Sequence, residues 1–456
     1  MNQAIKERIE KIKCGEVPEG YKTIGNIGII PVEWPEGVLS EVLYHEARAV
    51  PKPTNAYWRL GLRSHAKGTF HELVQDPENV DMEELFEVKE NDLIVNITFA
   101  WEHAVAIASK EDEGKLVSHR FPTYVFNHGN SPQFFKYIVM QRWFRKLLEN
   151  ISPGGAGRNR VMSKPAFLKL PCYIPPLHEQ EKIAEIVSTW DKAILLMENL
   201  IEEKKKQKKW LMQNLLNPDS GVRLPGFEGK WKEKNIGDLF EFLTSVPASR
   251  DQLGNKGFCY LHYGDIHKSK MPYINVEDEY ENIPKLNIDK VPNNAFLQDG
   301  DVVFVDASED YEGASKYIVV ENKFNLPFIA GLHTIGIRSK NNELNNEFKK
   351  HCFQSFNIKK QISFYASGIK VFGLSRENLA KLIIKFPSTD EQKAIANVLS
   401  TADKEIYLLE QELEQLQKQK KALMQLLLTG IVRVTIYPAK GGEKNGEEYT
   451  PCCSEF

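Results

Sequence analysis

The sequence lacks paired-cysteine motifs and long apolar runs. Its six cysteines stand at positions 14, 172, 259, 352, 452 and 453 without C-x-x-C spacing, so they indicate neither a zinc site nor a disulfide framework. No segment reaches the roughly 18 consecutive apolar residues that a membrane-spanning helix needs, and the charged N-terminus has no apolar signal-peptide core. We therefore expect a cytoplasmic protein with no bound metal and no membrane partner.

Motifs of the common catalytic classes are also missing. No G-x-x-x-x-G-K-[ST] phosphate loop occurs, and the segment that begins at Gly15 departs from this pattern at Tyr21. The G-x-S-x-G elbow, the H-E-x-x-H metal motif and the Asp/Asn-Pro-Pro-aromatic run of adenine methyltransferases are absent too. Histidines such as His45, His119 and His128 are more typical of surface or strand positions than of ligands. We therefore expect no catalytic residues in this chain.

Neither sign of charge dominates the composition. The formal net charge of −3 argues weakly against a chain that simply coats nucleic acid. Basic residues nevertheless cluster locally, apart from the acidic stretch Glu78 to Glu90, and one such cluster alone is more often a solvated face than a binding site. The basic clusters are Arg142, Arg145, Lys146, Arg158, Arg160 and Lys164, and then Lys349, Lys350, Lys359 and Lys360.

The strongest positive feature is an internal duplication. Residues 175–216 and 387–428 align without a gap, and about half of their positions are identical, against about one in fourteen expected by chance. The copies also agree upstream, where Trp34 and Trp231 open similar segments, but between such landmarks they diverge almost everywhere. A shared frame with different interiors is typical of two modules that act on two different targets.

Each repeated segment is predicted to form one long helix. Its apolar residues alternate at spacings of four and three, which is the pattern of the contact positions in a coiled coil. Because both copies carry this seam in the same register, the simplest partner for each helix is the other. A helix of about 39 residues spans roughly 58 Å. The seam positions are Ile183, Val187, Trp190, Ile194, Met197, Ile201, Lys204, Lys208, Leu211 and Leu215, and then Ile395, Leu399, Ala402, Ile406, Leu409, Leu413, Leu416, Lys420, Leu423 and Leu427.

Two details concern how these helices pair. The linker from Asn217 to Gly229 is too short to run back along such a helix, which favours an antiparallel pair. Lys204, Lys208 and Lys420 interrupt the apolar seam, where a buried amine is costly unless it reaches water or meets an acid. These lysines either specify the register of the pair or leave a frayed contact, and the sequence favours neither.

Each copy is predicted to begin with an α+β domain. Short β-rich segments precede an amphipathic helix, which we expect at about 133–149 in the first copy and 347–362 in the second. A basic turn that contains glycine follows each helix, at 153–160 and at 366–370. The β-rich segments are 92–99, 123–126, 301–305, 316–320 and 334–338.

These glycine turns are candidate phosphate-binding sites. Glycine lets a backbone approach a phosphate closely while N–H groups and basic side chains supply donors and charge, although a tight turn between a helix and a strand has the same pattern. The candidate residues are Arg158, Arg160 and Lys164 in the first copy and Lys370 in the second.

A second pair of segments carries side chains that can read base edges. Arg59 to Lys67 in the first copy is answered loosely by His262 to Lys270 in the second, and both are expected to be loops. Arginine suits guanine, and histidine or aspartate suits neighbouring groups, so different loops at one position would read different sequences. The candidates are Arg59, Arg63, His65 and Lys67, and then His262, Asp265, His267, Lys268 and Lys270.

The two long helices have similar starts. These are Pro175-Pro-Leu-His-Glu-Gln-Glu-Lys-Ile-Ala and Pro387-Ser-Thr-Asp-Glu-Gln-Lys-Ala-Ile-Ala, each followed by a lysine-rich helix that ends in Leu-Met-Gln. They resemble the helix starts of type I restriction-modification specificity subunits. The resemblance covers almost the whole chain. The second start departs from the usual Pro-Pro at Ser388, which affects only the local turn.

This resemblance implies an α+β fold with two pseudo-symmetric target recognition domains, separated by two long helices packed as an antiparallel coiled coil. The domains are expected at 1–174 and 217–386, the helices at 175–216 and 387–430, and a disordered tail at 431–456. Each domain is expected to bind one half of a bipartite double-stranded DNA site. The helices are expected to recruit two modification (methyltransferase) subunits, which bind S-adenosylmethionine, and restriction subunits, which use ATP and Mg, while this chain holds no cofactor.

Two other functions would fit parts of the sequence. A coiled-coil scaffold without DNA specificity would account for the helices but not for the divergent basic segments. A self-sufficient methyltransferase would need cofactor and catalytic motifs that are missing. We therefore expect a non-catalytic, sequence-specific DNA-binding subunit.

Overall fold

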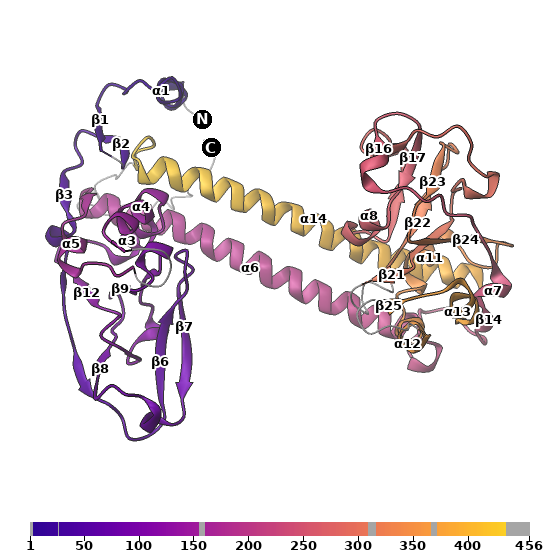
Figure 1. Ribbon diagram of the computed structural model, residues 1–456, viewed down its shortest axis with the longest axis horizontal. Helices are drawn as coiled ribbons and strands as arrows, with labels where there is room; N and C mark the ends of the chain where they lie inside the picture. The colour runs from indigo at the N-terminus through magenta and orange to yellow at the C-terminus, as the bar shows by residue number, and fades with distance from the viewer. Residues whose placement is uncertain (1–2, 26, 155–159, 309–315, 366–371, 435–456) are drawn as a thin grey trace, which may run out of the picture. The chain divides into compact units, whose positions relative to one another are not determined.

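The computed structural model describes residues 3–25, 27–154, 160–308, 316–365 and 372–434. The chain divides into two compact units (Figure 1). Unit 1 comprises Met1–Leu195 and Glu414–Phe456, and unit 2 comprises Leu196–Leu413. The division cuts across both long helices, α6 (Leu177–Leu215) and α14 (Thr389–Leu428). Each unit therefore combines segments from both copies of the duplication.

Unit 1 is built on two sheets, with strand orders β10-β9-β12-β4 and β5-β8-β11-β6-β7. The strands are β4 (Leu43–His45), β5 (Ala49–Pro51), β6 (Tyr57–Leu62), β7 (Thr69–Val74), β8 (Glu84–Glu87), β9 (Leu93–Val95), β10 (Val105–Ile107), β11 (Leu116–Val117) and β12 (Thr123–Phe126). Around them lie α1 (Gln3–Lys13), the pair β1 (Tyr21–Ile24) and β2 (Gly28–Pro31), the pair β3 (Glu36–Val38) and β13 (Pro171–Tyr173), α2 (Leu39–Val42), α3 (Pro132–Val139), α4 (Arg142–Asn150) and α5 (Lys164–Leu168).

Unit 2 also has two main sheets, with strand orders β15-β24-β20-β22-β18 and β16-β19-β17-β23. The strands are β15 (Phe240–Phe242), β16 (Leu253–Gly254), β17 (Phe258–Leu261), β18 (Tyr273–Asn275), β19 (Lys285–Leu286), β20 (Val302–Val305), β22 (Tyr317–Glu321), β23 (Phe328–Ala330) and β24 (Thr334–Ser339). The pairs β14 (Lys232–Asn235) with β26 (Ile383–Phe386) and β21 (Ala307–Ser308) with β25 (Phe372–Gly373) complete the strands. The helices are α7 (Ile236–Leu239), α8 (Tyr263–Lys268), α9 (Val276–Glu279), α11 (Asn346–Cys352), α12 (Phe356–Tyr365) and α13 (Arg376–Lys381).

The first sheets of the two units share one strand order. In unit 1, β10, β9, β12 and β4 lie side by side, and β22, β20, β24 and β15 repeat this order in unit 2, where β18 is added in parallel beside β22. The strands β9 and β20 consist of buried Leu, Ile, Val and Phe residues, because both of their faces are covered. The repeated order confirms that a folded α+β domain was duplicated.

The second sheets have five strands in unit 1 and four in unit 2, and they share one parallel pairing. In unit 1, β6 pairs in parallel with β11, and in unit 2, β17 pairs in parallel with β23. After this shared pairing, β6 turns into an antiparallel hairpin with β7, whereas β17 leads into the short helix α8. The two copies therefore place different elements at the same point of a common framework.

The structure corrects one predicted element in each copy. The helix expected at 133–149 is two helices, α3 and α4, because Gln141 adopts an extended backbone (φ −71°, ψ 146°) between them. The helix expected at 347–362 is likewise divided into α11 and α12, and Ser355 Oγ accepts a hydrogen bond from the backbone N of Ile358 at the start of the second. Neither break contains glycine or proline, so the apolar pattern runs on and predicts one helix.

The long helices pair antiparallel, as predicted. In unit 1, Ile183 and Val187 near the start of α6 share a core with Leu427 near the end of α14. In unit 2, Leu215 at the end of α6 shares a core with Ile395 near the start of α14. Every predicted seam position is buried or half-buried. The heptad pattern therefore identified the contact faces of both helices.

The lysines that interrupt the seam all meet acids. The pairs are Lys204–Glu405 and Lys208–Asp403 in unit 2 and Lys420–Asp191 in unit 1. The last two pairs occupy equivalent positions in the duplicated helices. Each lysine therefore has an acidic partner on the other helix, which contradicts a frayed seam and favours the interpretation that the lysines specify the register.

The Glu-Gln sequence at the start of each long helix makes the same contacts in both units. The amide oxygen of Gln180 accepts a hydrogen bond from the backbone N of Ser131, the N-cap of α3, at 2.8 Å. The amide oxygen of Gln392 accepts one from the backbone N of Asn345, the N-cap of α11, also at 2.8 Å. Both glutamines are fully buried. They fix each long helix to the preceding helical pair.

The preceding glutamates bind arginines that follow the long helices. Glu179 receives two hydrogen bonds from Arg433, at 2.6 and 3.1 Å, and Glu391 receives two from Arg223, at 2.6 and 2.7 Å. Each arginine thus ties the segment after one long helix to the start of the other. Arg433 belongs to the tail expected at 431–456, so one of the first residues of that segment has fixed partners. Residues 435–456 lie outside the described part.

Candidate nucleic-acid interface

The β6–β7 hairpin of unit 1 carries the first predicted reading segment. Arg59 lies within β6 opposite Glu72 of β7, and its guanidinium donates to that carboxylate at 2.7 Å. The expected loop from Arg59 to Lys67 is therefore wrong in its first part, since residues 59–62 are strand and the turn begins at Arg63. Alternate side chains of a strand share a face, so Arg59 and Arg63 project from the same side of the hairpin.

The turn of this hairpin has a strained backbone. His65 and Ala66 have φ values of 64° and 51°, in the left-handed region that residues with a side chain rarely adopt. Their N–H groups donate to the carbonyl oxygens of Glu102 and His103, at 2.8 and 2.7 Å. Strain of this kind persists only where the surroundings hold it, and it is concentrated at functional sites.

Three predicted side chains of the turn are exposed. They are Arg63, His65 and Lys67. The guanidinium carbon of Arg63 lies 5.5 Å from the centre of the Phe70 ring, and the guanidinium donates to the carbonyl of Thr69. The turn thus offers donors to solvent from a fixed backbone.

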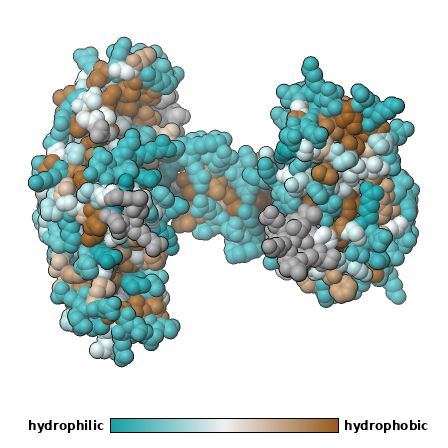
Figure 2. Space-filling view, in the orientation of Figure 1, coloured by the Kyte–Doolittle hydropathy of each residue, from teal (hydrophilic) through white to brown (hydrophobic). Residues whose placement is uncertain are grey.

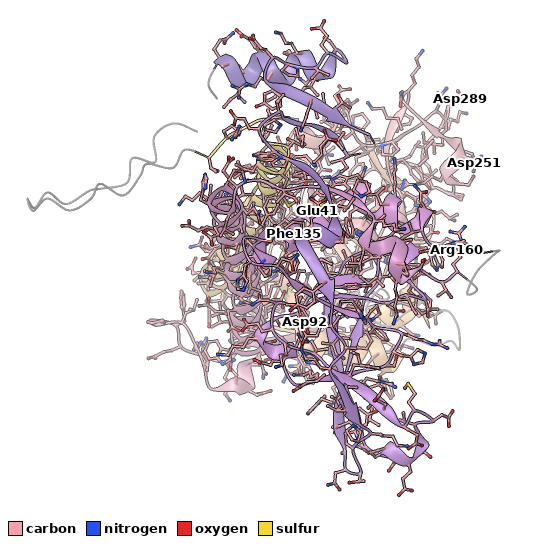
Figure 3. The ribbon with its side chains drawn as sticks, turned by 90° about the vertical axis from the view of Figure 1, so that its left-hand side faces the viewer. Glu41, Asp92, Phe135, Arg160, Asp251 and Asp289 are labelled. Carbon is pink, nitrogen blue, oxygen red and sulfur yellow. The ribbon has the colours of Figure 1, made fainter. Side chains whose placement is uncertain are left out.

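Arg160 lies beside the segment that holds this turn. Its guanidinium carbon is 5.4 Å from the centre of the Trp101 ring, and its Nη1 is 3.8 Å from Glu149. Figure 3 shows Arg160 at the outer edge of unit 1 in that view. Trp101 directly precedes Glu102 and His103, so one segment contacts both predicted surfaces of unit 1. Sequence reasoning missed Trp101, because no spacing connects it to either surface.

The remaining candidates for phosphate binding are only partly described. Lys164 is the first residue of α5 and is half-buried. Burial lowers the pKa of the neighbouring His45, and the charge of Lys164 lowers that pKa further. Arg158 and Lys370 lie outside the described residues, so the two glycine turns stay predictions.

In unit 2, the expected loop from His262 to Lys270 is wrong, because its centre forms the helix α8. His262 is the N-cap of α8, and its Nδ1 accepts a hydrogen bond from the backbone N of Gly264 at 3.0 Å. The side chain is buried, and burial lowers its pKa, with the charge of Arg250 lowering it further. His262 therefore caps α8, and the base contact predicted for it stays a prediction.

Aromatic rings gather around Tyr263 at the start of α8. The ring centres of His262, His333 and His267 lie 4.4, 5.5 and 6.2 Å from that of Tyr263. His333 has a left-handed backbone (φ 55°), and its Nδ1 lies 3.3 Å from Asp306. As in unit 1, a strained residue marks the candidate surface. Tyr263 and His333 are distant in sequence, and no pattern joins them.

One ion pair and one exposed lysine lie on α8, and a second exposed lysine follows two residues after the end of the helix. Arg250 donates to both carboxylate oxygens of Asp265, at 2.6 and 3.2 Å. Lys268 and Lys270 are exposed. The structure therefore brings four of the five predicted residues of this segment to one short helix and its ends. It adds Arg250, which the sequence analysis did not select.

One basic pair recurs in both units. Arg145 and Lys146 are exposed on α4, and Lys359 and Lys360 are exposed at the equivalent positions of α12. Both pairs lie at the same distance from the N-cap of the preceding helix. The sequence analysis grouped them with other basic residues but did not select them as site residues. Their equal spacing in the two copies was the signal that could have done so.

Lys349 and Lys350, grouped with them by sequence, are buried on α11. Lys349 Nζ donates to the carbonyl of Gly300 and to the side chain of Asn346, each at 2.9 Å. Burial lowers the pKa of Lys349 to about 8. Lys350 Nζ donates to Glu347 at 2.7 Å. These two lysines hold α11 in place and do not belong to the basic surface.

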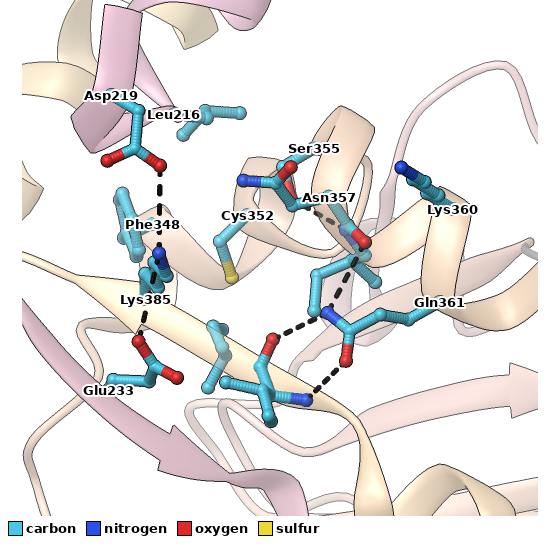
Figure 4. Close-up of a pocket in the computed structure, with 13 residues that line it drawn as sticks. Leu216, Asp219, Glu233, Phe348, Cys352, Ser355, Asn357, Lys360, Gln361 and Lys385 are labelled. Carbon is cyan, nitrogen blue, oxygen red and sulfur yellow. Dashed lines mark hydrogen bonds and ion pairs between the residues drawn. The ribbon is translucent and has the colours of Figure 1, made fainter.

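A surface cavity of about 270 Å³ lies beside α12 (Figure 4). The Gln361 amide both donates to and accepts from the backbone of Ile383 in β26, at 2.9 and 2.7 Å. Lys385 lies 3.6 Å from Asp219 and 3.7 Å from Glu233. These polar side chains of the cavity bind one another and the sheet edge. The Gln361 contacts tie α12 to β26.

The sequence matches a known family over most of its length. The type I restriction modification DNA specificity domain matches residues 72–205 and again residues 228–418. The chain belongs to this family. One match falls on each copy of the duplication, so the two copies are two DNA specificity domains.

Two curated relatives of this specificity protein come from Methanocaldococcus jannaschii. The putative type I restriction enzyme MjaX specificity subunit is 28% identical over 320 residues, which cover 68% of this chain and 67% of the relative. The type I restriction enzyme MjaVIII specificity subunit is 27% identical over 303 residues, which cover 60% of this chain and 64% of the relative. The chain thus spans about two thirds of the length of these relatives.

Two solved structures share the fold of this specificity protein. The type I restriction-modification system S subunit from M. genitalium is 15% identical, with a TM-score of 0.52, and the match covers 89% of this chain and 98% of that one. A chain from a structural study of complex assembly and conformational transition of the type I R-M system is also 15% identical, with a TM-score of 0.52, and covers 88% and 99%. These matches extend the common architecture over both units.

Within the described ranges, no three histidine, cysteine, aspartate or glutamate side chains are grouped to hold a metal ion. Over the same part of the chain, no helix combines the length and apolar character needed to cross a membrane.

Proposed function

We propose that this specificity protein reads a bipartite double-stranded DNA site, one half through unit 1 and the other through unit 2. One observation carries the proposal: after the shared strands β6 and β17, a common framework presents a hairpin in unit 1 and a helix in unit 2. Different side chains at one position of a repeated domain are what the reading of two different sequences requires. The basic pairs on α4 and α12 would supply contacts to phosphates in both halves.

The long helices are the proposed attachment site for two modification subunits, with restriction subunits completing the complex. Large apolar side chains are exposed on these helices, and Figure 2 shows apolar surface along their visible face. They include Leu195, Leu196 and Leu200 on α6 and Tyr407 and Leu408 on α14. Exposed apolar patches on a helix pair mark sites of protein association. The partners would bring S-adenosylmethionine, ATP and Mg, and the complex would act in the cytoplasm.

A coiled-coil scaffold without DNA specificity is the alternative. It would use the helix pair in the same way but would leave the strained and charged surfaces of both units without a purpose. Because the family itself is defined by DNA specificity, the scaffold reading has no observation in its favour.

The test is to map methylated adenines in the host genome with and without this gene. We expect a motif of two defined half-sites around an unspecified gap, present only with the gene. The purified chain alone should transfer no methyl group, and methylation should require a modification subunit with S-adenosylmethionine. Methyl transfer by the chain alone, or a methylome that does not depend on the gene, would contradict the proposal.

A further inference from the structure

The outer face of the β6–β7 hairpin points to one specificity-determining residue. We infer that Arg63 reads a guanine in the half-site bound by unit 1, and that Phe70 and Gly61 hold its guanidinium in position. This inference rests on the proposed function, because it concerns the same DNA surface. It goes further by separating one base-reading side chain from the other basic residues of the hairpin.

The strand register places these residues together. Gly61 lies opposite Phe70 in the antiparallel pair, and Arg59 lies opposite Glu72. Since side chains alternate between the two faces, Arg63 projects from the same face as these four residues. The charge of Arg59 is balanced by its carboxylate partner at 2.7 Å. Arg63 makes its contacts instead with a ring and a backbone carbonyl, so its charge is not balanced by an acid in these contacts.

Gly61 allows the Phe70 ring to lie flat over the hairpin. A Cβ atom added at Gly61 would overlap the ring atoms of Phe70. Phe70 is 39% exposed, and exposure of a large apolar side chain is unfavourable unless the ring makes a contact. The guanidinium of Arg63 makes that contact, since its carbon lies 5.5 Å from the ring centre, a distance typical of a cation–π interaction.

This arrangement prepares an arginine for base reading. A two-stranded ribbon fits the major groove of B-DNA, where arginine binds the O6 and N7 atoms of guanine with two parallel hydrogen bonds. An arginine that is already oriented loses less side-chain entropy on binding than a free one. The backbone of Arg63 is fixed as well, since its N–H donates to the carbonyl of Gly68 at 2.9 Å across the strained turn. The two parallel hydrogen bonds to guanine require the guanidinium at one fixed angle to the base edge, so an oriented arginine favours this contact.

The experiment uses the full chain in complex with its modification subunit. Methylated adenines first define both half-sites, and the probes are then duplexes with this motif and with each single base-pair replacement. For Arg63→Ala we expect discrimination at one G·C pair of the unit 1 half-site to fall by about 5- to 150-fold. Discrimination at every other position should be retained.

Two further variants test the positioning residues. Gly61→Ala should displace the ring and relax the same G·C pair by a smaller factor. In a Phe70→Ala background, where no ring is left to displace, Gly61→Ala should have no further effect. Trp58→Ala is the matched control, because Trp58 is exposed on the opposite face of the same strand. The complex that carries this variant should have the base preference of the wild type. Thermal unfolding of each variant checks that the hairpin remains folded.

The outcomes separate this inference from the proposed function. Equal weakening on all duplexes by Arg63→Ala would make Arg63 a phosphate contact and overturn the inference. Unchanged discrimination, or relaxation at an A·T pair or in the other half-site, would overturn it too. In each of these cases a bipartite motif would still stand. A wild-type complex without any bipartite motif would instead refute the proposed function.

Discussion

The hairpin of unit 1 and helix α8 of unit 2 occupy the same place in two copies of one fold. Each follows a strand that is paired in parallel with its neighbour, and each lies beside a residue with left-handed backbone. The hairpin, however, presents Arg63 over the Phe70 ring, whereas α8 presents Asp265 bound to Arg250. The framework therefore accommodates a change of secondary structure at its reading position, while the first sheets of both units keep one strand order.

The helix pair shows the opposite behaviour. Lys208–Asp403 and Lys420–Asp191 are equivalent pairs, and the Glu-Gln starts make equivalent contacts. One position nevertheless differs, since Asp191 accepts a hydrogen bond from Tyr137 and Asp403 lies beside His351. The two copies can therefore be compared by substitutions at matched positions.

The largest expected effect is on the seam. Asp403→Ala should lower the free energy of unfolding by about 3 kcal/mol, because it leaves Lys208 half-buried without its partner. Asp191→Ala should cost less, since the Asp191 side chain is 36% exposed against 13% for Asp403, and water replaces part of the interaction. Urea unfolding measures both. Equal losses would show that burial does not distinguish the Lys208–Asp403 pair from the Lys420–Asp191 pair. The double change Lys208→Met with Asp403→Leu should recover most of the lost free energy of unfolding.

The second effect depends on pH. Burial first, then the charges of Lys208 and Lys350, lowers the pKa of His351 to about 3, so this histidine is neutral in the folded protein. The unfolded chain binds more protons between about pH 6.5 and pH 3, so stability is full above this window and falls as the pH drops through it. We expect a loss of about 2 kcal/mol by pH 5. Unfolding of the His351→Gln variant between pH 7 and 5 should lack this loss.

Unit 1 has Tyr137 at the matched position. Burial raises the pKa of this phenol, so it does not titrate in the acidic range. Hydrogen exchange at pH 5 should therefore show unit 2 opening more readily than unit 1. Equal acid sensitivity of the two units would contradict the attribution of the acid-dependent loss of stability to His351.

The third effect concerns DNA affinity. Replacing Arg145 and Lys146 with alanine, or Lys359 and Lys360, should reduce the slope of log affinity against log salt by about 1.8 in each case, if each residue meets one phosphate. Binding titrations of the complex between 50 and 200 mM salt would measure these slopes. Near 0.15 M salt, each replaced residue should weaken the free energy of DNA binding by about 1 kcal/mol. Both double variants should behave alike on every sequence. A loss confined to one half-site base would assign that pair to reading instead.

The smallest effect on stability is expected at α8. Arg250→Ala should change the free energy of unfolding by less than about 1 kcal/mol, because its pair with Asp265 is exposed. It should still alter the base preferred in the half-site of unit 2, since it frees the carboxylate to accept from a base. Adenine methylation motifs of the variant and the wild type decide this. A change in the half-site of unit 1 would break the proposed division of labour.

Several features were predicted from local patterns and several were not. The seam from Ile183 to Leu215 followed from spacing, and the acids that meet Lys204, Lys208 and Lys420 required the pairing of two helices. The breaks before α4 and α12 were missed, because Gln141 and Ser355 interrupt the backbone without interrupting the apolar period.

The duplication, the antiparallel helix pair and membership of the specificity family could be predicted from the sequence, because repetition and heptad spacing are properties of the order of residues along the chain. Which basic side chains are available depends on the folded structure. Lys349 is buried on α11, Arg59 is bound to Glu72, and Arg63 lies over a ring from the neighbouring strand. Whether a charge is free depends on partners that are distant in sequence, and packing alone brings those partners together.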